Sequence, residues 1–108
     1  MLHTMGGSSR ESCTNFMATF LMKKKYRVII CSSRGCNGSK ITSKRLYNGY
    51  QPDDLKYIIA HISKKYPKAK NKFLMGFSLG SMVACMSIRS GIRRFRWRYM
   101  YLAYNKTI

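Results

Sequence analysis

The sequence predicts an α/β fold in which a parallel sheet is flanked by helices. Two largely apolar runs, at 26–31 and 73–77, have the length and composition of buried strands. Segments with the apolar period of a helix precede and follow each run. Strands that alternate with helices indicate βαβ units, and such a sheet needs helices on both of its faces. Because only two strands are clear, we expect one part of a larger domain.

The first helix is expected over 11–24, after the turn-rich stretch 3–9 (HTMGGSS). Apolar residues recur there at i, i+3, i+4, i+7 and i+8, which predicts one buried face. That face consists of Cys13, Phe16, Met17, Phe20 and Leu21. The run at 26–31 (YRVIIC) is rich in β-branched residues and is expected to form a buried strand.

The clearest helix is expected over 52–66, after a loop rich in Gly and Ser (SSRGCNGSKIT). Pro52 suits its first turn, and Asp53 and Asp54 face the positive end of the helix dipole. Pro67 ends it. Its expected buried stripe is Leu55, Ile58, Ile59 and Ile62.

The last part of this pattern is a strand at 73–77, a sharp turn and a helix at 79–90, with the sequence Gly-Phe-Ser-Leu-Gly at the turn. A GxSxG sequence between a strand and a helix is the arrangement of a nucleophile elbow. Gly76 and Gly80 would let strand and helix approach without a side-chain clash, while Ser78 takes up a strained backbone. Ser78 is thus the candidate nucleophile, and the Leu79 N–H is a candidate oxyanion donor. The alternative is an ordinary turn serine.

Four separate stretches of the sequence carry a resemblance to a known family. In chain order they are HTMGGSSRES, SSRGCNGSKIT, residues 47–54 and GFSLG. Together they resemble the α/β-hydrolase superfamily, and within it the YheT-like branch (hydrolase 4 family). That branch includes medium-chain fatty-acid ester synthase/esterases and related lipases. Residues 34–39 match its RGCGGS-like loop, and Asp53 and Asp54 match acids that open its next helix. The likeness covers about residues 2–91.

The resemblance implies a partial α/β-hydrolase fold and a serine hydrolase that cleaves carboxylic esters of acyl chains through an acyl-enzyme on Ser78. The expected substrate is a small acyl ester, and no cofactor is expected. In the family the glycine-rich first loop supplies a second oxyanion N–H, which by position is that of Thr4 or Met5. The loop departs from the family pattern at His3, which we interpret as a loop residue directed toward solvent or backbone.

The base and the acid of a catalytic triad are not in this chain after Ser78, where the sequence has no Asp, Glu or His. All three acids and both histidines precede it, and we interpret His61 as a surface or half-buried helical residue. In this fold the order is Ser, then Asp or Glu, then His. We therefore expect residues 1–91 to be the central portion of an α/β-hydrolase domain, inactive by itself. Residues 92–108 would be a basic aromatic tail outside the family pattern.

The charge balance suggests a second class of function, because 21 Lys and Arg face 3 acids and give a formal charge of +18. Such a chain could be a basic module that binds nucleic acid or an anionic membrane, with Trp97 among the arginines of 93–98. No nucleic-acid fold signature is present, so nucleic acid is not the expected partner, whereas a peripheral membrane contact is. A non-catalytic hydrolase-like binding protein is a third alternative.

Metal binding and membrane insertion find little support in the sequence. Four cysteines, Cys13, Cys31, Cys36 and Cys85, form no CxxC pair, and we interpret them as reduced thiols rather than metal ligands. The first residues lack the features of a signal peptide, and the longest apolar window, 16–22, is too short to span a bilayer. We expect a cytoplasmic or peripheral membrane location.

Overall fold

The computed structural model describes residues 1–48, 50, 52–92 and 97–102. These ranges contain three helices, α1 (Ser12–Lys23), α2 (Asp53–Lys65) and α3 (Leu79–Arg89), and two strands, β1 (Lys72–Phe77) and β2 (Trp97–Leu102). The longest of these helices has 13 residues. None of the described helices is long and apolar enough to cross a membrane.

The sheet is parallel in every described pairing. β1 and β2 pair in parallel, with Lys72 opposite Trp97 and Phe77 opposite Leu102. On the other side of β1, Leu2 forms isolated parallel bridges to both Gly76 and Cys31. The Leu2 N–H donates to Met75 O (2.8 Å), and the Leu2 carbonyl accepts from Phe77 N (3.1 Å). The segment before the first loop therefore lies in the middle of the sheet.

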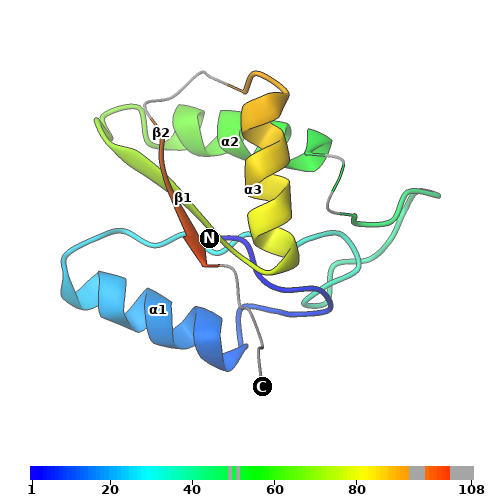
Figure 1. Ribbon diagram of the computed structural model, residues 1–108, viewed down its shortest axis with the longest axis horizontal. Helices are drawn as coiled ribbons and strands as arrows, with labels where there is room; N and C mark the ends of the chain where they lie inside the picture. The colour runs from blue at the N-terminus through cyan, green and yellow to red at the C-terminus, as the bar shows by residue number, and fades with distance from the viewer. Residues whose placement is uncertain (49, 51, 93–96, 103–108) are drawn as a thin grey trace.

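Helices lie on both sides of this sheet, as the sequence predicts (Figure 1). Figure 1 shows α2 and α3 on one side of the strands and α1 on the other. The core lies between α2, α3 and the strands, and it consists of Leu2, Leu55, Ile59, Leu74, Val83 and Ala84. The expected fold class, a partial α/β-hydrolase fold with a parallel sheet and flanking helices, is confirmed.

The predictions for the second half of the pattern agree with the structure within about one residue. α2 begins directly after Pro52 and ends at Lys65, and it buries Leu55 and Ile59 while Ile58 and Ile62 are half-buried. β1 and α3 coincide with the expected strand and helix. Here the apolar period, the acids in the first turn and the glycines all favour the same elements, which is why the sequence predicts them well.

The strand expected at 26–31 is wrong as a continuous strand. Only Cys31 forms a bridge, and residues 28–30 are half-buried without ladder pairing. The described neighbour on this side is the short segment Met1–Leu2, which offers the Met1 carbonyl to Cys31 N (2.9 Å) and the Met1 nitrogen to Ile29 O (2.6 Å). Within the described residues, the β propensity of the run is thus used for pairing only at Cys31.

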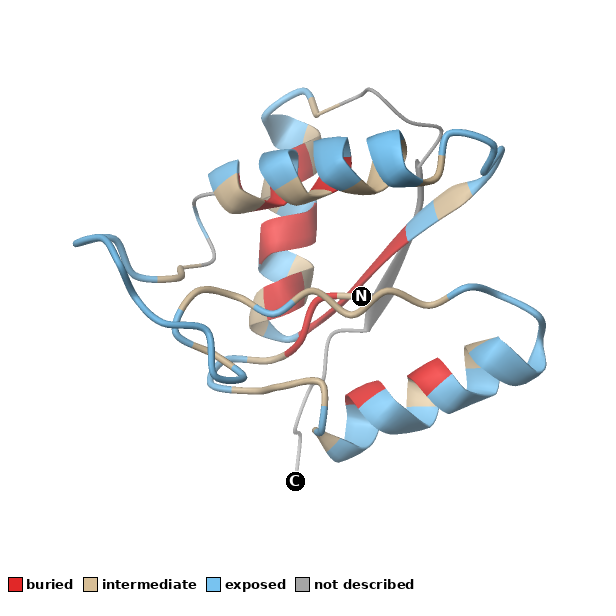
Figure 2. Cartoon of the chain, turned by 180° about the vertical axis from the view of Figure 1, so that it is seen from behind, coloured by how far each residue is buried: buried red, intermediate tan, exposed pale blue. Residues whose placement is uncertain are grey.

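The buried face expected for the first helix is only partly right: Met17 and Leu21 are half-buried, and the other three residues are exposed. Cys13 and Phe16 are exposed, Phe16 by 73% and Phe20 by 48%, whereas the buried residues of α1 are Thr14 and Ala18. The first turn of α1 is tied to the first loop on this side, since the Glu11 carboxylate accepts bonds from both the Thr14 hydroxyl (3.3 Å) and the Thr4 hydroxyl. Thr14 and Ala18 thus face inward, while most of the surface of α1 is exposed (Figure 2).

Part of the basic aromatic tail forms a strand that the sequence did not predict. Residues Trp97–Leu102 (WRYMYL) make up β2 and extend the sheet beyond β1. Aromatic residues favour strands, but arginines are interspersed among them here, so the sequence shows no clear alternation of apolar and polar residues. The domain boundary at residue 91 remains a prediction.

Candidate active site

Ser78 lies at the junction of β1 and α3, in a backbone conformation that non-glycine residues rarely adopt. Its φ is 48° and its ψ is −114°, and its side chain is exposed. Its carbonyl oxygen accepts bonds from Ser81 N (2.9 Å), Ser81 Oγ (2.5 Å) and Met82 N (3.3 Å), so the start of α3 holds the backbone of the turn. Within the described residues, the Ser78 hydroxyl makes no hydrogen bond and stays available to an approaching ligand.

The two glycines of the turn are required by close backbone contacts. A Cβ on Gly76 would lie 2.3 Å from the Gly80 carbonyl oxygen, and a Cβ on Gly80 would lie 2.6 Å from the Leu2 carbonyl oxygen and 2.7 Å from that of His3. Real Cβ atoms are not found at such distances. The turn therefore closes only with glycine at both positions, so Gly76 and Gly80 allow the close approach of strand and helix for which the sequence analysis singled them out.

The start of α3 provides hydrogen-bond donors next to Ser78. Ser78 is the residue that caps α3, and Leu79 is the first helical residue. The first N–H groups of a helix have no intrahelical acceptor, and the positive end of the helix dipole lies there. The Leu79 N–H is thus placed where it could stabilise negative charge on a group bound at Ser78.

The first loop, residues 3–9, packs against the same turn and is held by Glu11. The Glu11 carboxylate accepts a bond from the Thr4 hydroxyl and a long one from the Thr4 N–H (3.4 Å). Met5 follows directly and is 79% exposed. Of the two candidate oxyanion donors, Thr4 thus already directs its N–H to Glu11, whereas the Met5 N–H has no acceptor within the described residues.

His3 connects the first loop to the loop that follows residue 31. It is fully buried, which excludes the solvent-facing part of the sequence interpretation and supports the backbone-facing part. Its Nδ1 lies 2.7 Å from Thr4 O, and its Nε2 accepts the Ser33 N–H at 3.0 Å. This pair of bonds fixes the tautomer with the proton on Nδ1. Since both ring nitrogens are bound to backbone, His3 is not free to act as a base for Ser78.

The other histidine, His61, and the two aspartates lie on α2, where both aspartates form ion pairs. His61 is exposed on α2, as expected. Arg34 donates from Nε to Asp54 Oδ2 (2.7 Å) and from Nη2 to Asp54 Oδ1 (2.6 Å), and it also reaches Ser43 Oγ (2.8 Å). These hydrogen bonds lower the pKa of Asp54 below its ordinary value and raise that of Arg34. Asp54 therefore fixes the 34–39 loop to the start of α2, and Asp53 pairs more loosely with Arg45 (3.3 Å).

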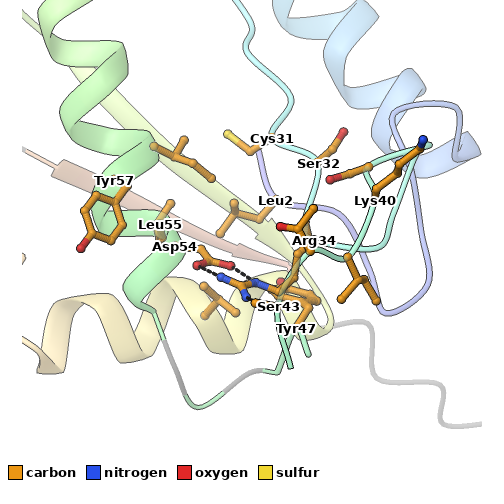
Figure 3. A pocket seen from close by; sticks show the side chains of 16 residues that line it. Leu2, Cys31, Ser32, Arg34, Lys40, Ser43, Tyr47, Asp54, Leu55 and Tyr57 are labelled. Atoms are coloured by element: carbon orange, nitrogen blue, oxygen red, sulfur yellow. Dashed lines mark hydrogen bonds and ion pairs between the residues drawn. The ribbon is translucent and has the colours of Figure 1, made fainter. Parts of the chain in front are cut away.

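A cavity of about 520 Å³ lies beside this ion pair (Figure 3). Its wall combines the apolar side chains of Leu2, Leu55 and Val83 with polar groups from the 32–43 loop. The Tyr47 hydroxyl is buried and has no hydrogen-bond partner among the described residues, and burial raises its pKa. Ser78 is not among the residues that line this cavity, so the cavity and the turn are separate features.

Two residues of this site were missed by the sequence interpretation: Glu11 as the anchor of the first loop, and His3 as a buried connector. The signal for Glu11 was present, because it is the sole acid in the first 52 residues of a strongly basic chain. The buried role of His3 had no comparable signal, because it depends on the Ser33 N–H, 30 residues away.

Comparison with known proteins identifies relatives of this chain. The family described as "alpha/beta hydrolase fold" matches residues 1–87. An abhydrolase domain-containing protein of Dictyostelium discoideum is 37% identical over 83 residues, which is 75% of this chain and 21% of the relative. A monoacylglycerol lipase of Saccharomyces cerevisiae is 34% identical over 84 residues, 77% of this chain and 18% of the relative.

A second protein of Saccharomyces cerevisiae, the medium-chain fatty acid ethyl ester synthase/esterase 2, is 28% identical over 82 residues, 75% of this chain and 18% of the relative. No solved structure matches the chain significantly. The chain spans about one fifth of the length of the curated relatives it matches. The residues that the family matches include the first loop, the 34–39 loop and the turn at Ser78.

Proposed function

The chain belongs to the alpha/beta hydrolase family, and we propose that it carries the nucleophile of a serine hydrolase that acts on carboxylic esters of acyl chains. The observation that carries this proposal is the backbone of Ser78, with φ 48° between two glycines in mutual contact. Strain of this kind costs roughly 1–3 kcal/mol and persists where the surroundings impose it, often at active sites. An ordinary turn serine would not need it.

In the proposed reaction, Ser78 Oγ attacks the ester carbonyl carbon and gives its proton to a base. The carbonyl oxygen becomes an oxyanion, which the Leu79 N–H and an N–H of the first loop stabilise. The Met5 N–H suits this second role better than that of Thr4, which already donates to Glu11. The C–O bond then breaks, the alcohol leaves with a proton, and water hydrolyses the acyl-enzyme to release the acid.

The base and the orienting acid for this reaction would come from outside the described chain. His3 is bound on both nitrogens, His61 is exposed on α2, and the sequence contains no Asp, Glu or His after Ser78. Loss of triad members costs roughly 10⁴–10⁶ in turnover, while an oxyanion hole alone retains about 10³–10⁴ over water. We therefore expect the chain by itself to react at Ser78 without useful turnover.

Covalent labelling of Ser78 tests this proposal. The purified chain is incubated with a fluorophosphonate, digested, and the modified serine is located by mass spectrometry. We expect Ser78 to carry the label ahead of every other serine, and added imidazole to accelerate labelling because it supplies the missing base.

Ser81 gives a matched control, since it lies one helical turn away and its hydroxyl already donates to the Ser78 carbonyl. Ser78→Ala should abolish the label, and Ser81→Ala should keep it. Equal labelling of many serines, or an imidazole effect that survives Ser78→Ala, would contradict the proposal.

The acyl-ester substrate class is supported by the names of the relatives, which include a monoacylglycerol lipase and a fatty acid ethyl ester synthase/esterase. Acylation of Ser78 by p-nitrophenyl esters with acyl groups of increasing length would measure which acyl length this protein prefers. The alternative function, a basic module for nucleic acid, gains no support from these names.

A further inference from the structure

One edge of the molecule combines positive charge with exposed apolar side chains. Residues 20–27, at the end of α1, and residues 64–73, from the end of α2 to the start of β1, form what we call the cationic edge. Figure 1 shows the ends of both helices and the start of β1 on the same side of the molecule. In Figure 2 most of this edge is exposed.

Ring and cation contacts hold the two segments of the cationic edge together. The Arg27 guanidinium lies 4.7 Å from the centre of the Tyr66 ring, and the Tyr26 and Phe73 rings meet edge to face at 5.9 Å. The Lys24 ammonium lies over the Phe20 ring at 5.9 Å. The edge is therefore a defined surface and not two unrelated loops.

Its charge is one-sided. Residues 20–27 contain four Lys or Arg, residues 64–73 contain five Lys, and neither segment contains an acid. The three acids of the chain, Glu11, Asp53 and Asp54, lie at the opposite ends of α1 and α2 and bind Thr4, Arg45 and Arg34. Both described ion pairs thus lie away from the cationic edge, which contains no Asp or Glu of its own.

Apolar groups are exposed between these cations. Met22 is 62% exposed, Tyr26 50% and Phe73 46%. Beneath them lies a second cavity of about 480 Å³, lined mainly by apolar side chains such as Leu21, Ile59 and Leu74. Lysines with flexible stems around exposed apolar side chains suit the interface of a bilayer, where the stems reach charged headgroups and the apolar groups enter the acyl boundary.

We propose that the cationic edge docks the protein on an anionic lipid bilayer. Nucleic acid fits this surface less well, because base stacking needs open ring faces. The Tyr66 ring is covered by Arg27 and Lys65, and Tyr26 and Phe73 already contact each other. The methionine and the apolar cavity also have no role in binding a polyphosphate backbone.

The orientation of the docked protein follows from the positions of Phe73 and Ser78 at the two ends of β1. Phe73 is near the start of the strand and Ser78 directly follows its end. Six residues of strand separate these ends by roughly 20 Å. The bilayer would thus lie at the end of the sheet away from Ser78, and the proposal does not depend on the chemistry of Ser78.

Vesicle flotation of the purified chain tests the proposal. The vesicles contain either phosphatidylcholine alone or phosphatidylcholine mixed with phosphatidylserine. The edge variant is Lys24→Glu, Lys68→Glu and Lys70→Glu, and the control variant is Lys40→Glu, Lys44→Glu and Lys56→Glu, three exposed lysines elsewhere. Both variants change the net charge equally. Circular dichroism of both variants verifies folding, and single substitutions replace any triple variant that unfolds.

We expect the natural chain to float with the mixed vesicles only. The edge variant should partition about a hundredfold less, since each lysine near an anionic leaflet contributes roughly fivefold to binding. The control variant should lose much less of its binding to the mixed vesicles. Equal losses in both variants, equal binding to phosphatidylcholine alone, or edge-dependent binding to an RNA oligonucleotide without vesicle binding would each overturn the proposal. Labelling of Ser78 is read separately, so failure of one proposal leaves the other standing.

Discussion

A Cβ atom added to Gly76 would lie 2.3 Å from the carbonyl oxygen of Gly80, so β1 and α3 touch through their backbones on either side of Ser78. This contact brings the end of the strand and the first turn of the helix together and leaves Ser78 to complete the turn with a positive φ. The positive φ at Ser78 thus accompanies close packing between two regular elements.

The first prediction concerns these glycines. Gly76→Ala and Gly80→Ala should each destabilise the fold by about 2–4 kcal/mol, because both new methyl groups would meet backbone that cannot move aside. Urea unfolding measures the loss. Gly38→Ala is the control: it has a positive φ but open space around it, and should cost only about 1–2 kcal/mol. Equal losses at all three positions would show that the contact is not responsible.

The second prediction concerns the strain at Ser78. Ser78→Gly should raise stability by about 1 kcal/mol, because glycine adopts this φ and ψ without the cost borne by serine. Ser78→Ala keeps the strain and should leave the urea midpoint nearly unchanged. A glycine variant no more stable than the alanine variant would mean that the turn stores no strain.

The third prediction concerns Glu11. Glu11→Ala should destabilise the fold by about 2 kcal/mol, since it removes the acceptor for Thr4 and leaves the fully buried Thr14 hydroxyl without a partner. Glu11→Gln retains one acceptor oxygen and should lose about half as much. Proton exchange of the Thr4 amide, followed by NMR, should accelerate in both variants. Unchanged exchange would mean that Glu11 does not hold the first loop.

The fourth prediction concerns the stability of the fold at acidic pH. Bonds from Arg34 lower the pKa of Asp54, so the folded state binds this proton less readily than the unfolded state. The resulting stability is present above the ordinary carboxyl pKa of about 3.9 and is lost as the pH falls toward the lowered value. Urea midpoints across this range should therefore fall less steeply for Asp54→Asn than for the natural chain. Asp53→Asn is the control, because its pair with Arg45 is longer and more exposed, and it should keep the steep fall.

The sequence predicted the elements in which local signals agree. In α2 the apolar stripe, the acids of the first turn and the flanking prolines all favour one helix, and the structure has it within a residue. The turn at Ser78 was predictable because two glycines at fixed spacing have few other uses between a strand and a helix. The family was predictable for the same reason, since three separated motifs agree.

The tertiary structure decided what depends on distant partners. The inward face of α1 carries Thr14 and Ala18, on the side where Glu11 ties the helix start to the first loop, and not the phenylalanines that dominate the apolar period. Within the described residues the 26–31 run pairs only at Cys31, and the buried His3 accepts the Ser33 N–H from 30 residues away. The period of the apolar residues indicates which secondary structure a segment favours and which of its faces is apolar. Which face is covered, and how far a strand pairs, depends on what the rest of the chain brings against it.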